Sequence, residues 1–430
     1  MAGRRRLNGL PVPVPDPDPV PDPDGHWVTV WAASAQAAYP VGSAIAQPPL
    51  DAALPDAARG LADQSLRMLL RPGLWSTRVR LRLSNVFGDR PLVLRDLGVA
   101  LHLGGGALVP GSRAALPDQV VAAGQSAWTP PVALPWLQGA DAALMQGRAL
   151  AFSARVDGAS GPVTWHAKSM ATSYLSAPGD RDAAGRDDAF GFPHGTTSTF
   201  VVDALDAWLP RSASAFVAFG DSLTDGTGST LNGLDRWTDV LQREAWRSGR
   251  GDLAIVNAGI GGNQVIGPPP GAGPWRGGPC AVERVARDVL SLSGVRTVFW
   301  LQGINDFSDN GGAEAIAVAE AVAATVRRLR GQGLRVIGAT LPSALGATRP
   351  GHGGAVQDAR RRVFNDAVRR GTLFDGVVDL DRCLSDARTG RLHTDFDGDD
   401  TLGGPGDGIH PNRAGHAAMA RCIGAAYFAP

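Results

Sequence analysis

The stretch that decides the fold is residues 215–223, AFVAFGDSL. Its first five residues, Ala215–Phe219, are all apolar and predict a short strand that is buried on both faces. Gly220-Asp221-Ser222 follows at once, and either the aspartate or the serine is a good cap for a helix that starts there. A buried strand that runs directly into a helix is typical of a parallel sheet with crossover helices.

The same pattern recurs toward the C-terminus, where short apolar runs alternate with amphipathic segments of helix length. The further predicted strands are Leu253–Val256, Thr297–Leu301, Arg335–Thr340 and Val377–Leu380. The predicted helices are Arg236–Ser248, Ala281–Leu290, Ala313–Arg330, Ala355–Arg370 and Asn412–Tyr427. This alternation predicts an α/β fold, a parallel five-stranded sheet with helices on both faces. Ligands of such sheets bind beyond the carboxyl ends of the strands.

The first half of the chain has a different pattern. Leu74–Asn85 alternates apolar and polar residues with period two, which predicts a half-buried strand. Similar runs occur at Val28–Ala33, Leu92–Leu103, Ala149–Val156 and Val163–Leu175. Long helical stripes are absent, so we expect a β-sandwich, or jelly-roll-like, domain. The predicted organisation is a Pro/Asp-rich disordered tail at 1–25, a β-sandwich accessory domain at 26–205 and a catalytic domain at 206–430.

Composition limits the classes of function. A chain of 430 residues predicts two domains, and a hydrophobic fraction of 44% excludes a mainly disordered protein. The 41 basic residues balance the 41 acidic ones, which argues against nucleic acid or an anionic membrane as partner. Lys168 is the only lysine. No apolar run reaches the roughly 18 residues that a transmembrane helix needs, and no apolar stretch follows the basic start at residues 1–6 to make a signal peptide.

The three cysteines, Cys280, Cys383 and Cys422, are widely spaced and do not match a zinc site or a disulfide-rich scaffold. At most one disulfide is possible, and buried free thiols are the favoured interpretation.

Polar residues that carry chemistry follow the predicted strands. Ser222 comes after the first strand, the segment 257–263 (NAGIGGN) after the second and 303–306 (GIND) after the third. Asp407 and His410 lie in DGIHPN, 407–412, which follows the fifth strand and a long loop. Because parallel strands end at one edge, these segments are expected to meet although nearly 190 residues separate them.

Together they supply what acyl transfer requires. Ser222 offers a hydroxyl nucleophile, His410 an imidazole that accepts a proton near neutral pH, and Asp407 a carboxylate that orients the ring. The oxyanion donors would be the backbone N–H groups of Ser222 and Gly262 and the side-chain amide of Asn305. Each segment alone has a simpler explanation as a helix cap or a tight turn. It is improbable that four unrelated caps or turns would occur in this order at one edge of the sheet.

In order, these segments resemble the blocks of the GDSL/SGNH hydrolases: GDSL, a glycine block, G-x-N-D and D-x-x-H. The resemblance covers about residues 213–428 and implies a flavodoxin-like α/β/α domain in which Ser222, Gly262, Asn305 and His410 take the four named roles and Asp407 completes the triad. Residues 220–230 (GDSLTDGTGST), with Arg236-Trp237, resemble a bacterial subfamily grouped with an esterase of xylan degraders. Its members begin with a β-rich region opened by a W-x-x-x-W-like strand, as Trp27 to Trp31 does here.

The resemblance implies a serine esterase that acts on short-chain acyl esters, with acetyl esters of carbohydrates or small alcohols as the preferred substrates. Acyl transfer by the same site, arylesterase or lysophospholipase activity, and carbohydrate binding by the β-rich domain are the alternatives. A secreted or extracytoplasmic location is favoured by the resemblance alone, and the oligomeric state stays open. Two loops depart from the family pattern, 267–279 (GPPPGAGPWRGGP), in which Trp275 either lines a pocket or lies on the surface, and 394–406 (TDFDGDDTLGGPG).

No cofactor or metal is expected. The aspartates of 395–400 suggest a calcium loop, but its glycine is misplaced and no glutamate follows at the proper distance. His166, beside Trp165, is interpreted as a packed strand residue, and His416 as a residue on the polar face of the last helix.

Overall fold

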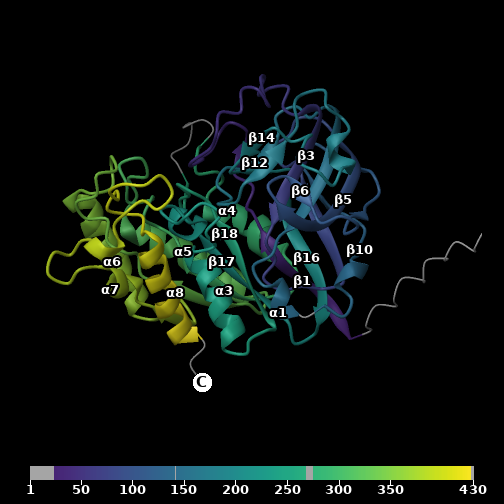
Figure 1. Cartoon of the computed structure of the whole chain (residues 1–430). Helices are drawn as coiled ribbons and strands as arrows, with labels where there is room; N and C mark the ends of the chain where they lie inside the picture. Colours follow the sequence, from purple (N-terminus) through teal and green to yellow (C-terminus); the bar gives the residue numbers. More distant parts are fainter. Residues whose placement is uncertain (1–23, 141, 268–274, 428–430) are drawn as a thin grey trace, which may run out of the picture.

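The computed structural model describes residues 24–140, 142–267 and 275–427 (Figure 1). Most of the predicted tail at 1–25 and part of the loop 267–279 therefore lie outside the described residues. Two regions follow each other along the chain, a β-rich region up to Pro210 and an α/β region after it.

The α/β region contains the predicted five-stranded sheet, which is parallel throughout. Its strands stand in the order β18-β17-β19-β20-β21, the order of flavodoxin-like folds. In the register of the three neighbouring strands β18, β17 and β19, Gly220 pairs with both Gly259 and Leu301, so their carboxyl ends lie level. The strands are β17 (Ser214–Gly220), β18 (Leu253–Gly259), β19 (Val295–Leu301), β20 (Arg335–Ala339) and β21 (Gly376–Val378).

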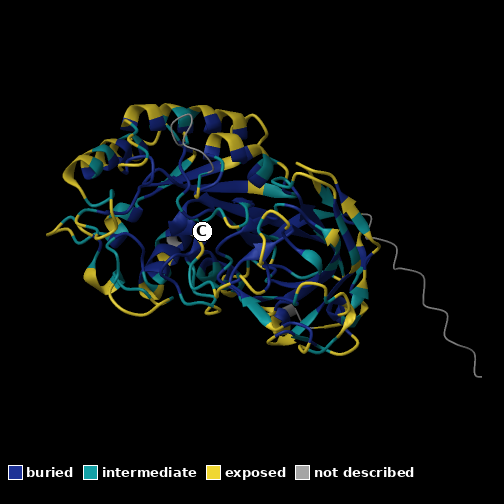
Figure 2. Ribbon diagram, turned by 90° about the horizontal axis from the view of Figure 1, so that it is seen from above, coloured by how far each residue is buried: buried dark blue, intermediate teal, exposed yellow. Residues whose placement is uncertain are grey.

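Helices cover both faces of this sheet, and its inner strand β17 is buried along its whole length. Helix α3 packs against α8, and α5 packs against α6. In Figure 2 the sheet is dark blue and the helices show yellow on their outer sides. The helices are α2 (Ser222–Asp225), α3 (Trp237–Arg247), α4 (Ala281–Val285), α5 (Ala315–Arg330), α6 (Ala355–Arg369), α7 (Leu380–Leu384) and α8 (Arg413–Tyr427), and α4 continues into a π-helical turn at Ala286–Leu290.

The first region is built from antiparallel sheets, which confirms its predicted β-rich character, whereas the jelly-roll arrangement stays a prediction. The main paths are β1-β16-β4-β10, β14-β13-β3-β11-β5-β6 and β15-β12-β2. The elements are β1 (Gly25–Ala32), β2 (Ala37–Ala38), β3 (Ala62–Leu70), β4 (Arg78–Ser84), β5 (Leu92–Gly104), β6 (Ala107–Leu108), β7 (Ala114–Ala115), β8 (Gln119–Val121), β9 (Ser126–Trp128), β10 (Val132–Ala133), α1 (Ala142–Met145), β11 (Leu150–Ala159), β12 (Thr164–His166), β13 (Ser173–Leu175), β14 (His194–Thr196), β15 (Thr199–Phe200) and β16 (Val202–Pro210).

Two predicted strands differ from the structure. The strand predicted at Leu74–Asn85 starts only at Arg78, because the chain is still irregular after Pro72-Gly73. The strand predicted at Val163–Leu175 is two strands, β12 and β13, which belong to different sheets. Between them Met170 has a left-handed φ of 52°, which a continuous strand does not allow. This break carries Lys168 out of the sheet.

The two regions are in close contact. Strand β1 packs against β18, and one cluster of buried apolar side chains extends from Val28 to Ile423. Strand β16 runs across residue 205, the predicted domain boundary, and the division into two folding units stays a prediction. None of the described helices is both long and apolar enough to cross a membrane.

The favoured interpretation of the cysteines as free thiols is wrong for two of them. Cys383 on α7 and Cys422 on α8 form a disulfide, whereas Cys280 is free and buried. Sequence spacing did not reveal the pair because packing of α7 against α8 brings the two residues together.

A buried arginine ties the carboxyl ends of the strands together. Arg284 of α4 donates to the carbonyl of Gly220 at 2.7 Å and to that of Ala258 at 2.9 Å. It also donates to Asn263 Oδ1 at 2.8 Å and pairs with Asp288 at 3.0 Å. Its side chain is fully buried, so its removal would take one hydrogen-bond partner from each of these acceptors.

We predict that Arg284→Met lowers the free energy of unfolding by roughly 2–3 kcal/mol, because two buried carbonyls each lose a donor and Asp288 keeps only its pair with Arg287. Denaturant titration followed by circular dichroism measures this. Arg328→Met, which removes an exposed arginine of α5, is the control and should change stability by less than about 0.5 kcal/mol. Equal effects of the two substitutions would contradict the structural role of Arg284.

Candidate active site

Ser222 stands at a sharp turn from strand to helix. It is the first residue of α2, and Asp221 caps that helix by accepting from the backbone N–H of Leu223 at 3.0 Å. A Cβ atom on Gly220 would lie 2.6 Å from the carbonyl oxygen of Leu301, so only glycine fits at this bend. The capping role that seemed an alternative to a catalytic one is therefore filled by Asp221, and the hydroxyl of Ser222 stays available.

The structure brings Ser222, His410 and Asp407 into one hydrogen-bonded line. His410 Nε2 lies 2.8 Å from Ser222 Oγ, and His410 Nδ1 lies 2.7 Å from Asp407 Oδ2. Because a carboxylate only accepts, Nδ1 carries the proton and Nε2 offers its lone pair to the serine hydroxyl. This is the tautomer that a general base for Ser222 needs.

The second oxygen of Asp407 fixes the turn that carries the histidine. Asp407 Oδ1 accepts from the backbone N–H groups of Ile409 at 3.0 Å and His410 at 2.9 Å. Burial alone would raise the pKa of Asp407, but the hydrogen bonds from His410 outweigh it and hold the pKa well below its usual range. Burial lowers the pKa of His410, with Asp407 opposing that shift, so the ring is neutral at neutral pH.

The predicted oxyanion donors surround the same space. Gly262 has a left-handed φ of 79°, which favours glycine. Asn305 Nδ2 donates one proton to the carbonyl of Asn263 at 3.0 Å, and its second proton remains for a ligand. On its other side, Asn305 Oδ1 lies 3.2 Å from His352 Nε2, a contact that orients the amide and that sequence reasoning missed.

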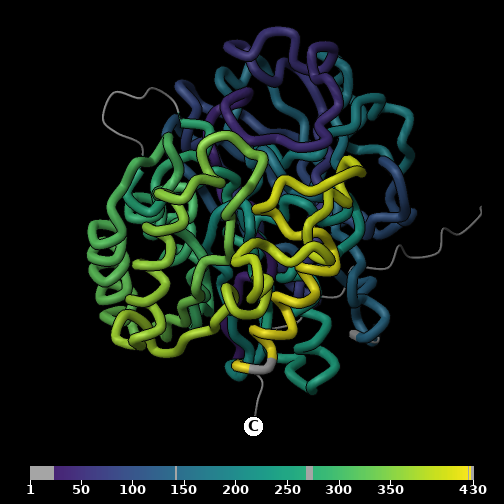
Figure 3. Tube along the Cα trace, turned by 90° about the vertical axis from the view of Figure 1, so that its left-hand side faces the viewer, coloured from purple at the N-terminus to yellow at the C-terminus, as the bar shows by residue number. Residues whose placement is uncertain are grey.

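All five predicted site residues line one cavity of about 470 Å³. The β-rich region contributes to its wall through residues 42–45 and Lys168. Figure 3 shows purple segments of this region above the green and yellow segments of the α/β region. From the loops that depart from the family pattern, Arg276, Asp399 and Leu402 line the cavity, whereas Trp275 does not.

The acidic loop uses its carboxylates to order the backbone. Asp397 Oδ1 accepts from the N–H of Gly408 at 3.0 Å, next to the Asp–His block. Asp399 and Asp400 likewise accept from backbone N–H groups, those of Thr401 and Arg413. Among the described residues, no group of three or more His, Cys, Asp or Glu side chains is placed to hold a metal ion.

Of two further histidines, His416 differs from expectation and His166 agrees with it. His416 is not on a polar face but fully buried, where its Nδ1 accepts from the backbone N–H of Trp237 at 3.2 Å. His166 is packed, as predicted, but its Nε2 also lies 3.2 Å from Asp225 Oδ1, at the end of α2. The helical periodicity of a sequence does not show which other helix covers a given face. The burial of His416 could therefore not be predicted from the sequence.

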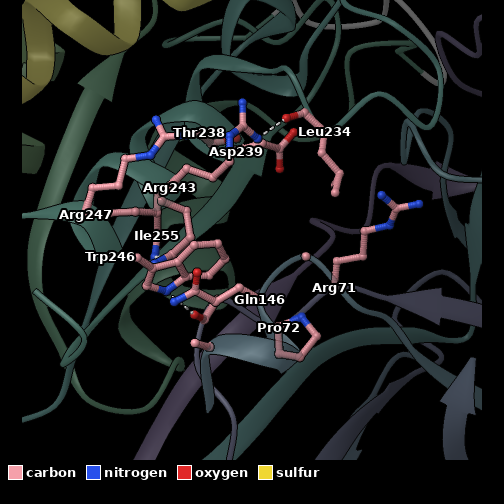
Figure 4. Close-up of a pocket in the computed structure, with 14 residues that line it drawn as sticks. Arg71, Pro72, Gln146, Leu234, Thr238, Asp239, Arg243, Trp246, Arg247 and Ile255 are labelled. Carbon is pink, nitrogen blue, oxygen red and sulfur yellow. Dashed lines mark hydrogen bonds between the residues drawn. The ribbon is translucent and has the colours of Figure 1, made fainter. Parts of the chain in front are cut away.

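A second cavity, of about 320 Å³, lies between α3 and the β-rich region (Figure 4). Arg71, Gln146 and Trp246 are among the side chains around it. None of the predicted site residues lines this cavity, so the first cavity is the candidate active site.

Part of the chain matches a known protein family. The GDSL-like lipase/acylhydrolase family matches residues 218–418, which contain all four motif blocks. No curated protein matches the chain. Among solved structures, the chain is similar to a carbohydrate acetylesterase from Sinorhizobium meliloti, with 17% identity and a TM-score of 0.37 over 49% of this chain and 96% of that chain. It is also similar to an aryl esterase from M. smegmatis, with 17% identity and a TM-score of 0.37 over 49% of this chain and 96% of that chain.

The family match begins inside β17, four residues before Ser222, and ends in α8, eight residues after His410. It thus spans every α/β element that contributes to the triad. Residues 218–418 thus match the GDSL-like lipase/acylhydrolase family, and this match supports a carboxylic ester hydrolase.

Proposed function

We propose that the chain hydrolyses carboxylic esters through an acyl-serine intermediate on Ser222. The observation that carries this proposal is the line of hydrogen bonds from Asp407 through His410 to Ser222, at 2.7 Å and 2.8 Å. Such a line lets a neutral imidazole remove the hydroxyl proton as the oxygen attacks.

In the first half of the reaction, Ser222 Oγ adds to the ester carbonyl and its proton passes to His410 Nε2. The carbonyl oxygen becomes an oxyanion that accepts from the N–H groups of Ser222 and Gly262 and from the amide of Asn305. The tetrahedral intermediate collapses, the bond to the alcohol oxygen breaks, and His410 returns the proton to the leaving alcohol. The acyl group now esterifies Ser222.

In the second half, water replaces the alcohol. His410 takes a proton from water as the water oxygen adds to the acyl carbon, and the same donors hold the second oxyanion. When this intermediate collapses, the bond to Ser222 Oγ breaks and His410 gives the proton back to it. Asp407 stays ionised throughout and stabilises the imidazolium formed in each half.

We propose short acyl esters of carbohydrates or small alcohols as substrates. The lining of the cavity supports this choice, because polar side chains are well represented in it, among them Ser43, Thr227 and Asp399. These groups suit a leaving alcohol with several hydroxyls. The apolar side chains in the wall are few, chiefly Ile45, Leu402 and Ile409, and give little cover for a long acyl chain.

The β-rich region at 26–205 is proposed as an accessory domain that shapes this cavity. Its loop at residues 42–45 lies in the wall, and Gln36 Nε2 donates to the carbonyl of Gly261 at 3.4 Å. The β-rich region therefore borders the glycine block that supplies an oxyanion donor.

The proposal is tested with a panel of p-nitrophenyl esters and acetylated oligosaccharides. We expect the wild type to release acid from short acyl esters and Ser222→Ala to lose at least ~10³-fold in kcat/KM. Ser248→Ala, at the end of α3 and outside the cavity, is the matched control and should keep wild-type activity. A wild type inert on the whole panel, or an active Ser222→Ala, would contradict the proposal. Product analysis with an added alcohol distinguishes hydrolysis from acyl transfer.

We predict that Asp407→Asn lowers the pKa of His410 still further below its usual range. The carboxylate is the group that opposes the effect of burial, so its loss makes the imidazolium less stable. A proton NMR titration of the histidine ring measures this, with His410→Gln to assign the signal. A pKa that stays the same or rises would show that Asp407 does not hold the imidazolium.

We predict that Asn305→Ala reduces kcat by roughly 10²–10³-fold and changes KM little, because the lost amide acts on charge that exists only in the transition state. Steady-state kinetics on a p-nitrophenyl ester measures both constants. A variant with normal kcat and a raised KM would assign Asn305 to ground-state binding instead.

A further inference from the structure

Lys168 is a buried cation that the proposed mechanism does not use. It is the one lysine in a chain with 41 basic residues. It lies in the break between β12 and β13, is 4% exposed, and lines the same cavity as Ser222, Gly262 and His410. A buried ammonium is costly unless its charge has a partner, so its position needs an explanation.

The ammonium lies against the glycine block. A Cβ atom on Gly261 would be 2.9 Å from Lys168 Nζ, so the charge stands over the backbone one residue before the proposed oxyanion donor, Gly262. Nζ donates to Thr227 Oγ1 and lies 3.8 Å from Asp225 Oδ2. Of its three protons, the hydroxyl of Thr227 takes one, and the carboxylate is beyond ordinary hydrogen-bond length.

Asp225 does not need Lys168 to balance its charge. His166 Nδ1 lies 2.8 Å from the carbonyl of Ser34, and its Nε2 lies 2.8 Å from that of Lys168. Both ring nitrogens face acceptors, and only an imidazolium donates from both. The Asp225 carboxylate, 3.2 Å from Nε2, is thus paired with a positive histidine. Attraction to Asp225 outweighs burial and raises the pKa of His166, which agrees with this protonation.

The cluster of His166, Asp225 and Lys168 therefore carries one positive charge in excess, and that charge borders the cavity. When Ser222 adds to the ester carbonyl, a negative charge develops on the ester oxygen in this cavity. A fixed cation in a buried position stabilises such developing charge without any reorganisation.

We propose that Lys168 is a substrate-facing cation that stabilises the oxyanion of the tetrahedral intermediates, so that the β-rich region supplies a working part of the active site. This inference rests on the proposed function of Ser222. No bond to Lys168 forms or breaks, and its ammonium keeps its three protons throughout the reaction.

The charged groups around Lys168 make the proposal measurable. Asp225, Asp221 and Asp407 attract the ammonium and Arg349 repels it, while burial lowers its pKa. Lys168 in turn helps to lower the pKa of His410, together with burial and Arg349. Removing the ammonium should therefore raise the pKa of His410 and move the acidic limb of the kcat/KM profile to higher pH. A purely structural role for Lys168 does not require this shift.

The kinetic test compares Lys168→Met with wild type on p-nitrophenyl acetate and on an ester with a carboxylate in its acyl group. We expect kcat to fall roughly 10- to 100-fold on both esters, KM to change little, and the acidic limb to move up in pH. Arg328→Met serves as the surface control. Unchanged kcat would overturn the proposal, and so would an effect confined to KM of the anionic ester, which would make Lys168 a ground-state anion site.

A second test uses the full chain without substitution. After ¹³C-lysine labelling, one side-chain signal is expected, and its pH titration gives the pKa of Lys168. We expect this pKa to rise when Ser222 carries an anionic phosphonate adduct, and an unchanged value would overturn the proposal. Failure of the adduct to form on Ser222, or wild-type inactivity, would instead count against the proposed function.

Discussion

The level carboxyl ends of β17, β18 and β19 are the constraint on which the active site depends. Gly220 pairs with Gly259 on one side and Leu301 on the other, so the loops after all three strands start from one line. Arg284 holds this line by donating to the carbonyls of Gly220 and Ala258. Because the three loops start at the same level, Ser222, Gly262 and Asn305 lie around one cavity although they are distant in sequence.

The fold of the α/β region could be predicted because its information is local. The apolar residues within one segment show which of its faces is buried, and the carboxyl ends of parallel strands lie at one edge of the sheet. For the same reason Ser222, Gly262, Asn305, Asp407 and His410 could be selected together. The break after His166 carries no such signal, because it depends on which sheet each half of the segment joins. Lys168, His352 and Arg276 reach the cavity through packing between distant segments, which periodicity does not describe.

The β-rich region and the α/β region meet at the glycine block. Asp225 accepts from the N–H of Gly261 at 2.7 Å and also contacts His166, so one carboxylate joins the end of α2 to both the oxyanion loop and the β-rich region. Gln36, whose backbone N–H donates to the carbonyl of Trp165 at 2.9 Å, reaches the same loop. The turn that carries the proposed nucleophile and the loop proposed to bind the oxyanion are both held by Asp225, which favours a preorganised site over one assembled by the substrate.

The central claim is that the acyl group passes through Ser222. The most direct measurement is peptide mass spectrometry of the wild-type chain, acid-quenched within milliseconds of mixing with p-nitrophenyl acetate. The account predicts an acetyl group on the peptide that contains Ser222, and on no other residue in stoichiometric amount. An acetyl group on a different residue in that amount, or a burst of p-nitrophenol with no acetylated protein, would contradict it.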